Sequence, residues 1–102
     1  DQHGTTLLMT ASYNHLAEFV AELLRLGADA RRVDVGGLSA LHWVAVNARD
    51  GGAAAEVVRQ LVAAGCDPAV RDRDGRTAVE LARSRGDEWG REVEGWVAAA
   101  MA

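Results

Sequence analysis

The chain has 102 residues, of which 49% are hydrophobic and 25% are charged, a balance typical of one folded, soluble domain. Its formal net charge is −4, from 11 basic and 15 acidic residues, whereas nucleic-acid-binding domains usually carry a basic excess. No apolar run approaches the roughly 18 residues that a membrane-spanning helix needs. We therefore expect neither nucleic acid nor a membrane among its partners.

Cysteine usage indicates a reducing compartment. Cys66 is the single cysteine, so no disulfide can form within the chain, and we expect an intracellular protein of the cytoplasm or nucleus. No signal peptide is recognisable. Because the sequence starts at Asp1 rather than at a methionine, we expect it to be a piece of a longer protein.

One short pattern occurs three times: a glycine, a hydroxyl residue two positions later, and an aliphatic residue after two more. Its copies are Gly4, Thr6 and Leu8; Gly37, Ser39 and Leu41; and Gly75, Thr77 and Val79. The first and second glycines are 33 residues apart, and the second and third are 38 residues apart. Such a period predicts stacked repeats within a single domain, 1–102, with units at residues 1–33, 34–71 and 72–102.

Each unit is expected to hold a turn and two helices. The glycine suits a tight turn because it adopts positive φ without strain, and Thr6, Ser39 and Thr77 are placed to cap the helix that follows. Gly27 and Gly65 mark the ends of later helices. Before those glycines, apolar residues recur at helical spacing: Leu16, Phe19, Val20, Leu23 and Leu24, and then Ala54, Val57, Val58, Leu61 and Val62.

The second and third units depart from the common pattern. The second holds about five extra residues near 47–53, where Gly51 and Gly52 predict a flexible loop, either a tolerated insertion or a contact. The third ends on a longer helix with Trp89 and Trp96 among charged residues, which predicts a C-terminal capping helix. No such cap precedes Asp1, so either the first unit is itself the cap or earlier repeats were removed.

The segment from Gly37 to Ala45 resembles the ankyrin-repeat pattern Gly-x-Thr-Pro-Leu-His-x-Ala-Ala. The resemblance covers the whole chain and implies an all-α solenoid of three helix-turn-helix units with short hairpin-like turns. It also implies that His42, at the position of the motif histidine, packs between repeats and hydrogen-bonds to a neighbouring turn.

The chain shows no pattern of catalytic or metal-ligating residues. Cys66 is expected to be a small buried residue, and His3 and His15 are expected to be exposed. The histidines and the cysteine do not have metal-ligand spacing, and without lysine there is no phosphate-binding loop. We therefore expect no enzyme activity, no cofactor and no metal. Trp43, Trp89 and Trp96 are expected in the core.

The resemblance implies a partner protein or peptide on the concave face, which is formed by the turn tips and the first helices. The candidate contact residues on that face are Tyr13, Asn14, Val35, Leu38, Val46, Asn47, Arg73 and Arg76. An apolar patch with Tyr and Arg beside it is typical of interaction sites.

Two other roles stay open beside a binding module. The domain could regulate a larger enzyme or signalling protein, in which case its partner would be intramolecular. It could instead serve assembly, by stacking on further repeats or on itself, and the sequence does not give its oligomeric state.

Overall fold

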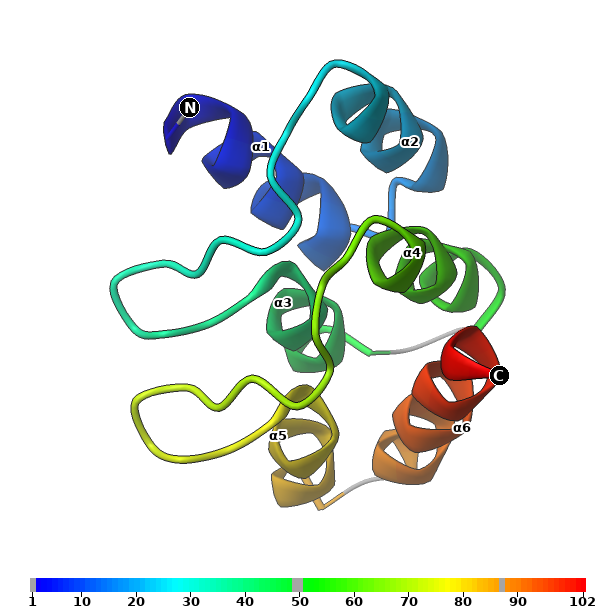
Figure 1. The fold of residues 1–102 in the computed structure, drawn as a ribbon. Coiled ribbons are helices and arrows are strands. Elements are labelled where there is room, and N and C mark those ends of the chain that lie inside the picture. Colours follow the sequence, from blue (N-terminus) through cyan, green and yellow to red (C-terminus); the bar gives the residue numbers. More distant parts are fainter. Residues whose placement is uncertain (1, 49–50, 87) are drawn as a thin grey trace.

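The computed structural model describes residues 2–48, 51–86 and 88–102, which form six α-helices and no strand. The helices are α1 (Gln2–Tyr13), α2 (Ala17–Arg25), α3 (Ala40–Val46), α4 (Gly51–Ala63), α5 (Ala78–Ser84) and α6 (Trp89–Met101). Successive helices form three antiparallel pairs, which we call repeats 1, 2 and 3 (Figure 1). The predicted all-α solenoid of three helix-turn-helix units is confirmed.

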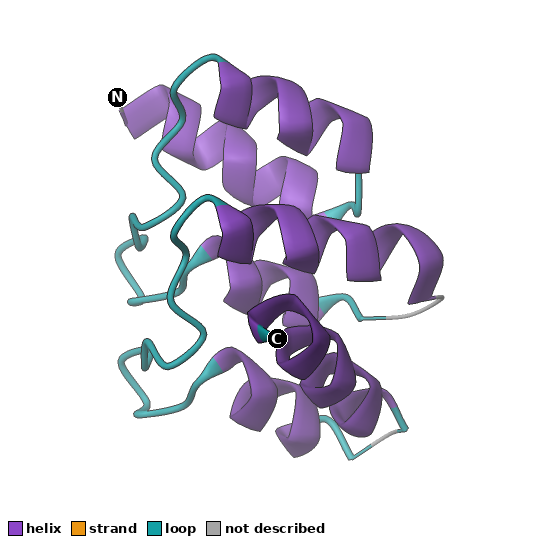
Figure 2. Ribbon diagram, turned by 45° about the vertical axis from the view of Figure 1, so that its right-hand side comes forward, coloured by secondary structure: helices purple, strands orange, loops and turns teal. Residues whose placement is uncertain are grey.

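The helices lie in two layers (Figure 2). One layer contains α1, α3 and α5 in contact with one another in that order, and the other contains α2, α4 and α6. The loops that join the repeats project from one side, beside the first layer. Because each repeat contacts its neighbours along the stack, the apolar helix faces that lie between repeats are buried.

A continuous apolar core runs between the layers. Its largest fully buried aliphatic side chains are Leu8, Val20, Leu41, Val44, Val57, Val58, Leu61 and Val93. Val20, Val57, Val58 and Leu61 belong to the helical stripes predicted from the sequence. Phe19 belongs to the same predicted stripe, but 44% of its surface is exposed.

Local residue chemistry sets four of the helix ends. The Ser39 hydroxyl accepts from the His42 N–H and the Thr77 hydroxyl accepts from the Glu80 N–H, so two of the three predicted caps are confirmed. Gly27 and Gly65 have φ of 98° and 103°. At each, the next residue donates to a carbonyl five residues back, which closes the helix C-terminus.

The turns of repeats 2 and 3 are the predicted hairpin-like turns. The Asp34 N–H donates to the Leu38 carbonyl at 3.0 Å, and the Asp72 N–H donates to the Arg76 carbonyl at 2.9 Å. Gly37 and Gly75 complete these turns with φ of 78° and 80°. The turns are joined to each other, because the Arg73 N–H donates to the Gly36 carbonyl at 3.0 Å.

The predictions for the start of repeat 1 are wrong. Because α1 begins at Gln2, Gly4 and Thr6 lie inside the helix rather than in a turn and at its cap. His15, expected to be exposed, is buried at 8% exposure and has φ of 56°. It follows α1 where Gly86, with φ of 76°, follows α5, so it occupies a position that favours glycine. The side chain of His3 lies outside the described residues.

The flexible loop predicted at Gly51 and Gly52 is also wrong in part. Both residues begin α4, which has 13 residues against nine in α2. The extra residues of repeat 2 therefore mostly lengthen this helix by about one turn. The alanines that follow favour helix, and this preference offsets the cost of the two glycines. Residues 49–50, in the same predicted loop, lie outside the described part.

Candidate functional site

An apolar groove opens on the first helix layer between α1 and α3. It is lined by Met9, Thr10, Tyr13, Asp34, Trp43 and Val46 and has a volume of about 400 Å³. We call it the α1–α3 groove. Thr10 and Trp43 stand at the same place in their repeats, as do Tyr13 and Val46. The repeat therefore aligns two copies of one helix face, and the larger side chains on this face form the walls of the groove.

Two aromatic rings form the centre of the groove. Tyr13 and Trp43 meet edge to face, with ring centroids 6.0 Å apart and planes at 79°. The indole N–H of Trp43 donates to Asp34 Oδ2 at 3.1 Å, which fixes the ring against the turn of repeat 2. Tyr13 and Val46 remain 38% and 37% exposed, so a ligand can reach both.

The Asp34 carboxylate holds this arrangement together. Its Oδ1 accepts from the Gly36 and Leu38 N–H groups at 2.9 and 3.0 Å, while its Oδ2 accepts from Trp43. The same aspartate therefore shapes the turn and orients the indole. A groove held in this way is formed before any ligand arrives, which lowers the entropy cost of binding.

The two predicted asparagines use their amide donors inside the domain. Asn47 Nδ2 donates to the Tyr13 carbonyl at 2.7 Å and so joins α3 to the end of α1. Asn14 Nδ2 donates to the Thr10 carbonyl at 2.9 Å, one turn back along α1. These bonds help to hold the groove helices in place.

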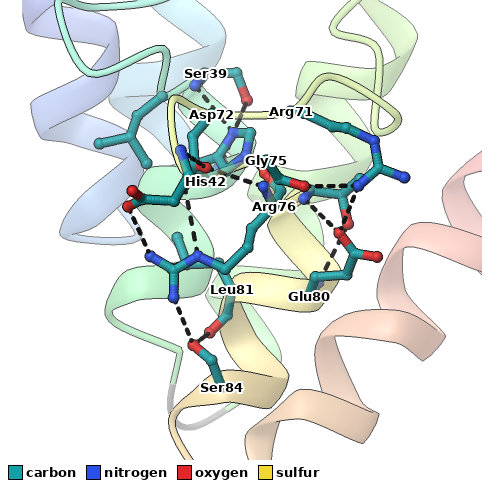
Figure 3. A network of polar contacts seen from close by, with 12 residues as sticks. Ser39, His42, Arg71, Asp72, Gly75, Arg76, Glu80, Leu81 and Ser84 are labelled. Carbon is teal, nitrogen blue, oxygen red and sulfur yellow. Dashed lines mark hydrogen bonds and ion pairs between the residues drawn. The ribbon is translucent and has the colours of Figure 1, made fainter.

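The remaining predicted residues lie on the hairpin-like turns. Val35 is 86% exposed at the tip of the repeat 2 turn, Leu38 is half-buried beside it, and Arg73 is exposed on the next turn. Arg76 is engaged within the domain, because its guanidinium contacts Asp74 Oδ2 at 3.2 Å and Ser84 Oγ at 3.3 Å (Figure 3).

His42 joins repeats 2 and 3 and is fully buried (Figure 3). Its Nδ1 accepts the Ser39 N–H at 3.1 Å, so the ring proton is on Nε2, which donates to the Arg76 carbonyl at 2.8 Å. The structural role that the ankyrin resemblance implied for this histidine is confirmed.

Four groove residues were missed by the sequence interpretation: Met9, Thr10, Asp34 and Trp43. Of these, Trp43 was expected in the core. The signal was present, because Trp43 precedes Val46 by three positions on α3 and residues at that spacing share a helix face. The other two tryptophans, Trp89 and Trp96, are partly buried against the core as expected.

The groups that could carry chemistry do not form a reactive site. Cys66 is buried as expected, and burial raises the pKa of its thiol, which keeps it protonated and unreactive at neutral pH. Within the described residues, no cluster of three or more His, Cys, Asp or Glu side chains could hold a metal ion. In that same part of the chain, no helix has the length and apolar character needed to cross a bilayer.

Comparison with known proteins gives a consistent result. A family model described as ankyrin repeats (3 copies) matches residues 1–72. The E3 ubiquitin-protein ligase Ufd4 of Drosophila melanogaster is 36% identical over 93 residues, which cover 91% of this chain and 3% of that protein.

A solved structure agrees with the sequence matches. The crystal structure of an ankyrin repeat domain from Acinetobacter baumannii AYE superposes with a TM-score of 0.75 at 30% identity. The match covers 93% of this chain and 47% of that one, so the chain spans less than half of the solved domain. The repeat spacing, the capped helix pairs and these matches lead to one conclusion: the chain belongs to the ankyrin-repeat family.

Proposed function

We propose that this domain is a binding module that holds a segment of a partner protein in the α1–α3 groove. Ankyrin repeats in general are protein-interaction modules. The observation that supports this site is the contact of the exposed Tyr13 with the half-buried Trp43, whose indole the Asp34 carboxylate fixes in an apolar recess. Aromatic residues in recesses of this kind contribute a large share of binding energy at protein interfaces.

The groove favours an apolar side chain as the central contact. Its lining offers Met9, Tyr13, Trp43 and Val46, and the carboxylate of Asp34 is already engaged. A volume of about 400 Å³ accommodates one large side chain with part of its neighbours. The flanking residues of such a segment would then run over the turn tips, which carry Val35, Leu38 and Arg73.

Trp43 provides a direct test, because it is the tryptophan in the groove and the other two lie on α6. Peptides selected from a random library against the domain are titrated while tryptophan fluorescence is recorded. We expect selected peptides to carry a large apolar residue and to change the emission. The Trp43→Phe variant should lose the change in emission while keeping most of the affinity.

Two charge substitutions at exposed aliphatic residues complete the experiment. Val46→Asp places a carboxylate in the groove and should weaken binding at least about tenfold, the loss expected for a central apolar contact. Leu26→Asp changes an aliphatic residue on the second helix layer that is 69% exposed and should leave binding unchanged. If both variants bind the selected peptides as well as the parent does, the groove is not the site.

A second candidate is the regulatory role within a larger enzyme. The observation that favours it is the match to a ubiquitin ligase in which the similar segment makes up 3% of the protein. The groove would then hold a segment of the same polypeptide. Adding the peptides selected above to the full-length protein would compete with that segment and change its activity, whereas an unchanged activity would count against the regulatory role.

A further inference from the structure

On the first helix of repeats 2 and 3, the same position faces the preceding repeat. Ala40 and Ala78 occupy it in repeats 2 and 3, and each is 2% exposed. Repeat 3 is the last described pair, so the neighbouring repeat that can cover Ala78 is repeat 2. The residue at this position in repeat 1 is Leu7, which is larger and 48% exposed.

The second helices show the same contrast. Counted back from the glycines that end α2 and α4, Phe19 and Val57 are equivalent. Val57 is 0% exposed, whereas Phe19 is 44% exposed. The repeat 1 helices therefore present two large apolar side chains where the repeat 2 helices are covered by repeat 1. We call Leu7 and Phe19 the N-terminal end face.

The opposite end of the stack is charged rather than apolar. Its outer side carries an ion pair between Arg83 and Glu94, with Arg91 and Glu92 exposed nearby. Among the described residues of repeat 3, Met101 is the single large apolar side chain that is exposed. A second copy of the chain would have to bring this charged surface onto the N-terminal end face to extend the stack, which would desolvate its charges without compensation.

We propose that the N-terminal end face docks a further ankyrin repeat that precedes repeat 1 in the same polypeptide and stacks on it as repeat 1 stacks on repeat 2. Repeat 1 is then an internal repeat, not a cap. The interface would continue the one that already buries Ala40 and Val57. This inference is independent of the α1–α3 groove and of what binds there.

The test adds a repeat directly ahead of residue 1. A copy of residues 1–33 is fused there. In the parent chain, the side of repeat 1 that faces the next repeat already packs against repeat 2. The length of the copy also equals the 33-residue distance from Gly4 to Gly37. The same copy is fused ahead of a Leu7→Ala, Phe19→Val chain, whose end face then has the residues of repeat 2. Because each added interface stabilises a repeat stack, we expect the Tm of at least one fusion to rise by about 5–10 °C.

Matched variants test whether the rise in Tm depends on the N-terminal end face. Leu7→Lys with Phe19→Glu should leave the Tm of the unfused chain nearly unchanged, since both residues are exposed there, but should remove the gain in the fusion. Leu26→Lys should keep the gain, because Leu26 and its equivalent Ala64 are both exposed and face no repeat. The absence of a Tm gain in both fusions would overturn the proposal.

Sedimentation of the unfused chain provides a second test of the proposal. If the chain is a monomer across micromolar concentrations, its end face does not pair with a second copy, as the proposal requires. A dimer that the Leu7→Lys, Phe19→Glu variant abolishes would show that two end faces pair with each other, and it would overturn the proposal in favour of self-association.

Discussion

Gly37 and Gly75 form a natural pair for testing how the turns pack. Both have φ near 80°, so alanine at either position adopts a left-handed conformation at a cost of roughly 1–2 kcal/mol. Their surroundings differ. A Cβ at Gly75 would meet nothing within 4 Å, whereas a Cβ at Gly37 would lie 3.0 Å from the Arg73 backbone nitrogen and 3.2 Å from the Asp72 backbone.

The contact at Gly37 is with backbone, which cannot rotate away as a side chain can. Relief requires the turns of repeats 2 and 3 to separate, which would stretch the 3.0 Å bond from the Arg73 N–H to the Gly36 carbonyl. Overpacking of this kind adds about 1–3 kcal/mol. We expect Gly75→Ala to cost roughly 1–2 kcal/mol of unfolding free energy and Gly37→Ala about 2–5 kcal/mol.

Urea unfolding followed by circular dichroism measures both variants on one scale. A domain of this size has a total stability of about 5–15 kcal/mol, so the Gly37→Ala variant should remain folded but with a clearly lower midpoint. Equal midpoints for the two variants would refute the reasoning, because the two sites would then share the φ cost alone and the close approach of the turns would carry no energy.

Three further predictions concern buried groups. His15→Gly should be about 1 kcal/mol more stable than His15→Ala in urea unfolding, because both remove the imidazole and only alanine strains at φ of 56°; equal values would contradict this. The Arg76 N–H bonded to Asp72 lowers the pKa of that carboxyl, with a further bond from the Asp74 N–H. Its stabilisation is therefore present above the ordinary carboxyl pKa and is lost as the pH falls through the lowered one. The stability gap between the parent and Asp72→Asn should shrink between about pH 5 and about pH 2, and a constant gap would refute the assignment. Cys66 should resist alkylation at neutral pH until denaturant is added, and rapid labelling of the folded chain would show that its burial is wrong.

The features predicted correctly from residue type and spacing alone depend on contacts near in sequence. Ser39 and Thr77 cap their helices because each hydroxyl reaches an N–H three residues later. Gly27 and Gly65 end helices because the backbone there needs positive φ. These requirements are met within a few residues, so the type of residue and its spacing were enough to predict them.

The failures concern positions whose environment depends on a neighbouring repeat. The turn expected before Thr6 is replaced by helix, because α1 already begins at Gln2. His15 was expected to be exposed, although its place matches Gly86 of repeat 3, where the backbone has positive φ. Trp43 was assigned to the core because aromatic residues at helical spacing are usually buried. Among the described residues, no third layer of helices covers α3, and the Trp43 side chain borders the groove there.

Phe19 shows how such a failure can be informative. Its helical spacing placed it in the core stripe with Val20 and Leu23, which are buried. A repeat sequence specifies the positions that are buried when a neighbour is present on both sides. A residue that fits this pattern but is exposed in the folded chain therefore marks a side where the neighbour is missing. By this reasoning, the exposure of Leu7 and Phe19 locates an interrupted interface at one end of the stack, where a preceding repeat would restore the environment that Val57 already has.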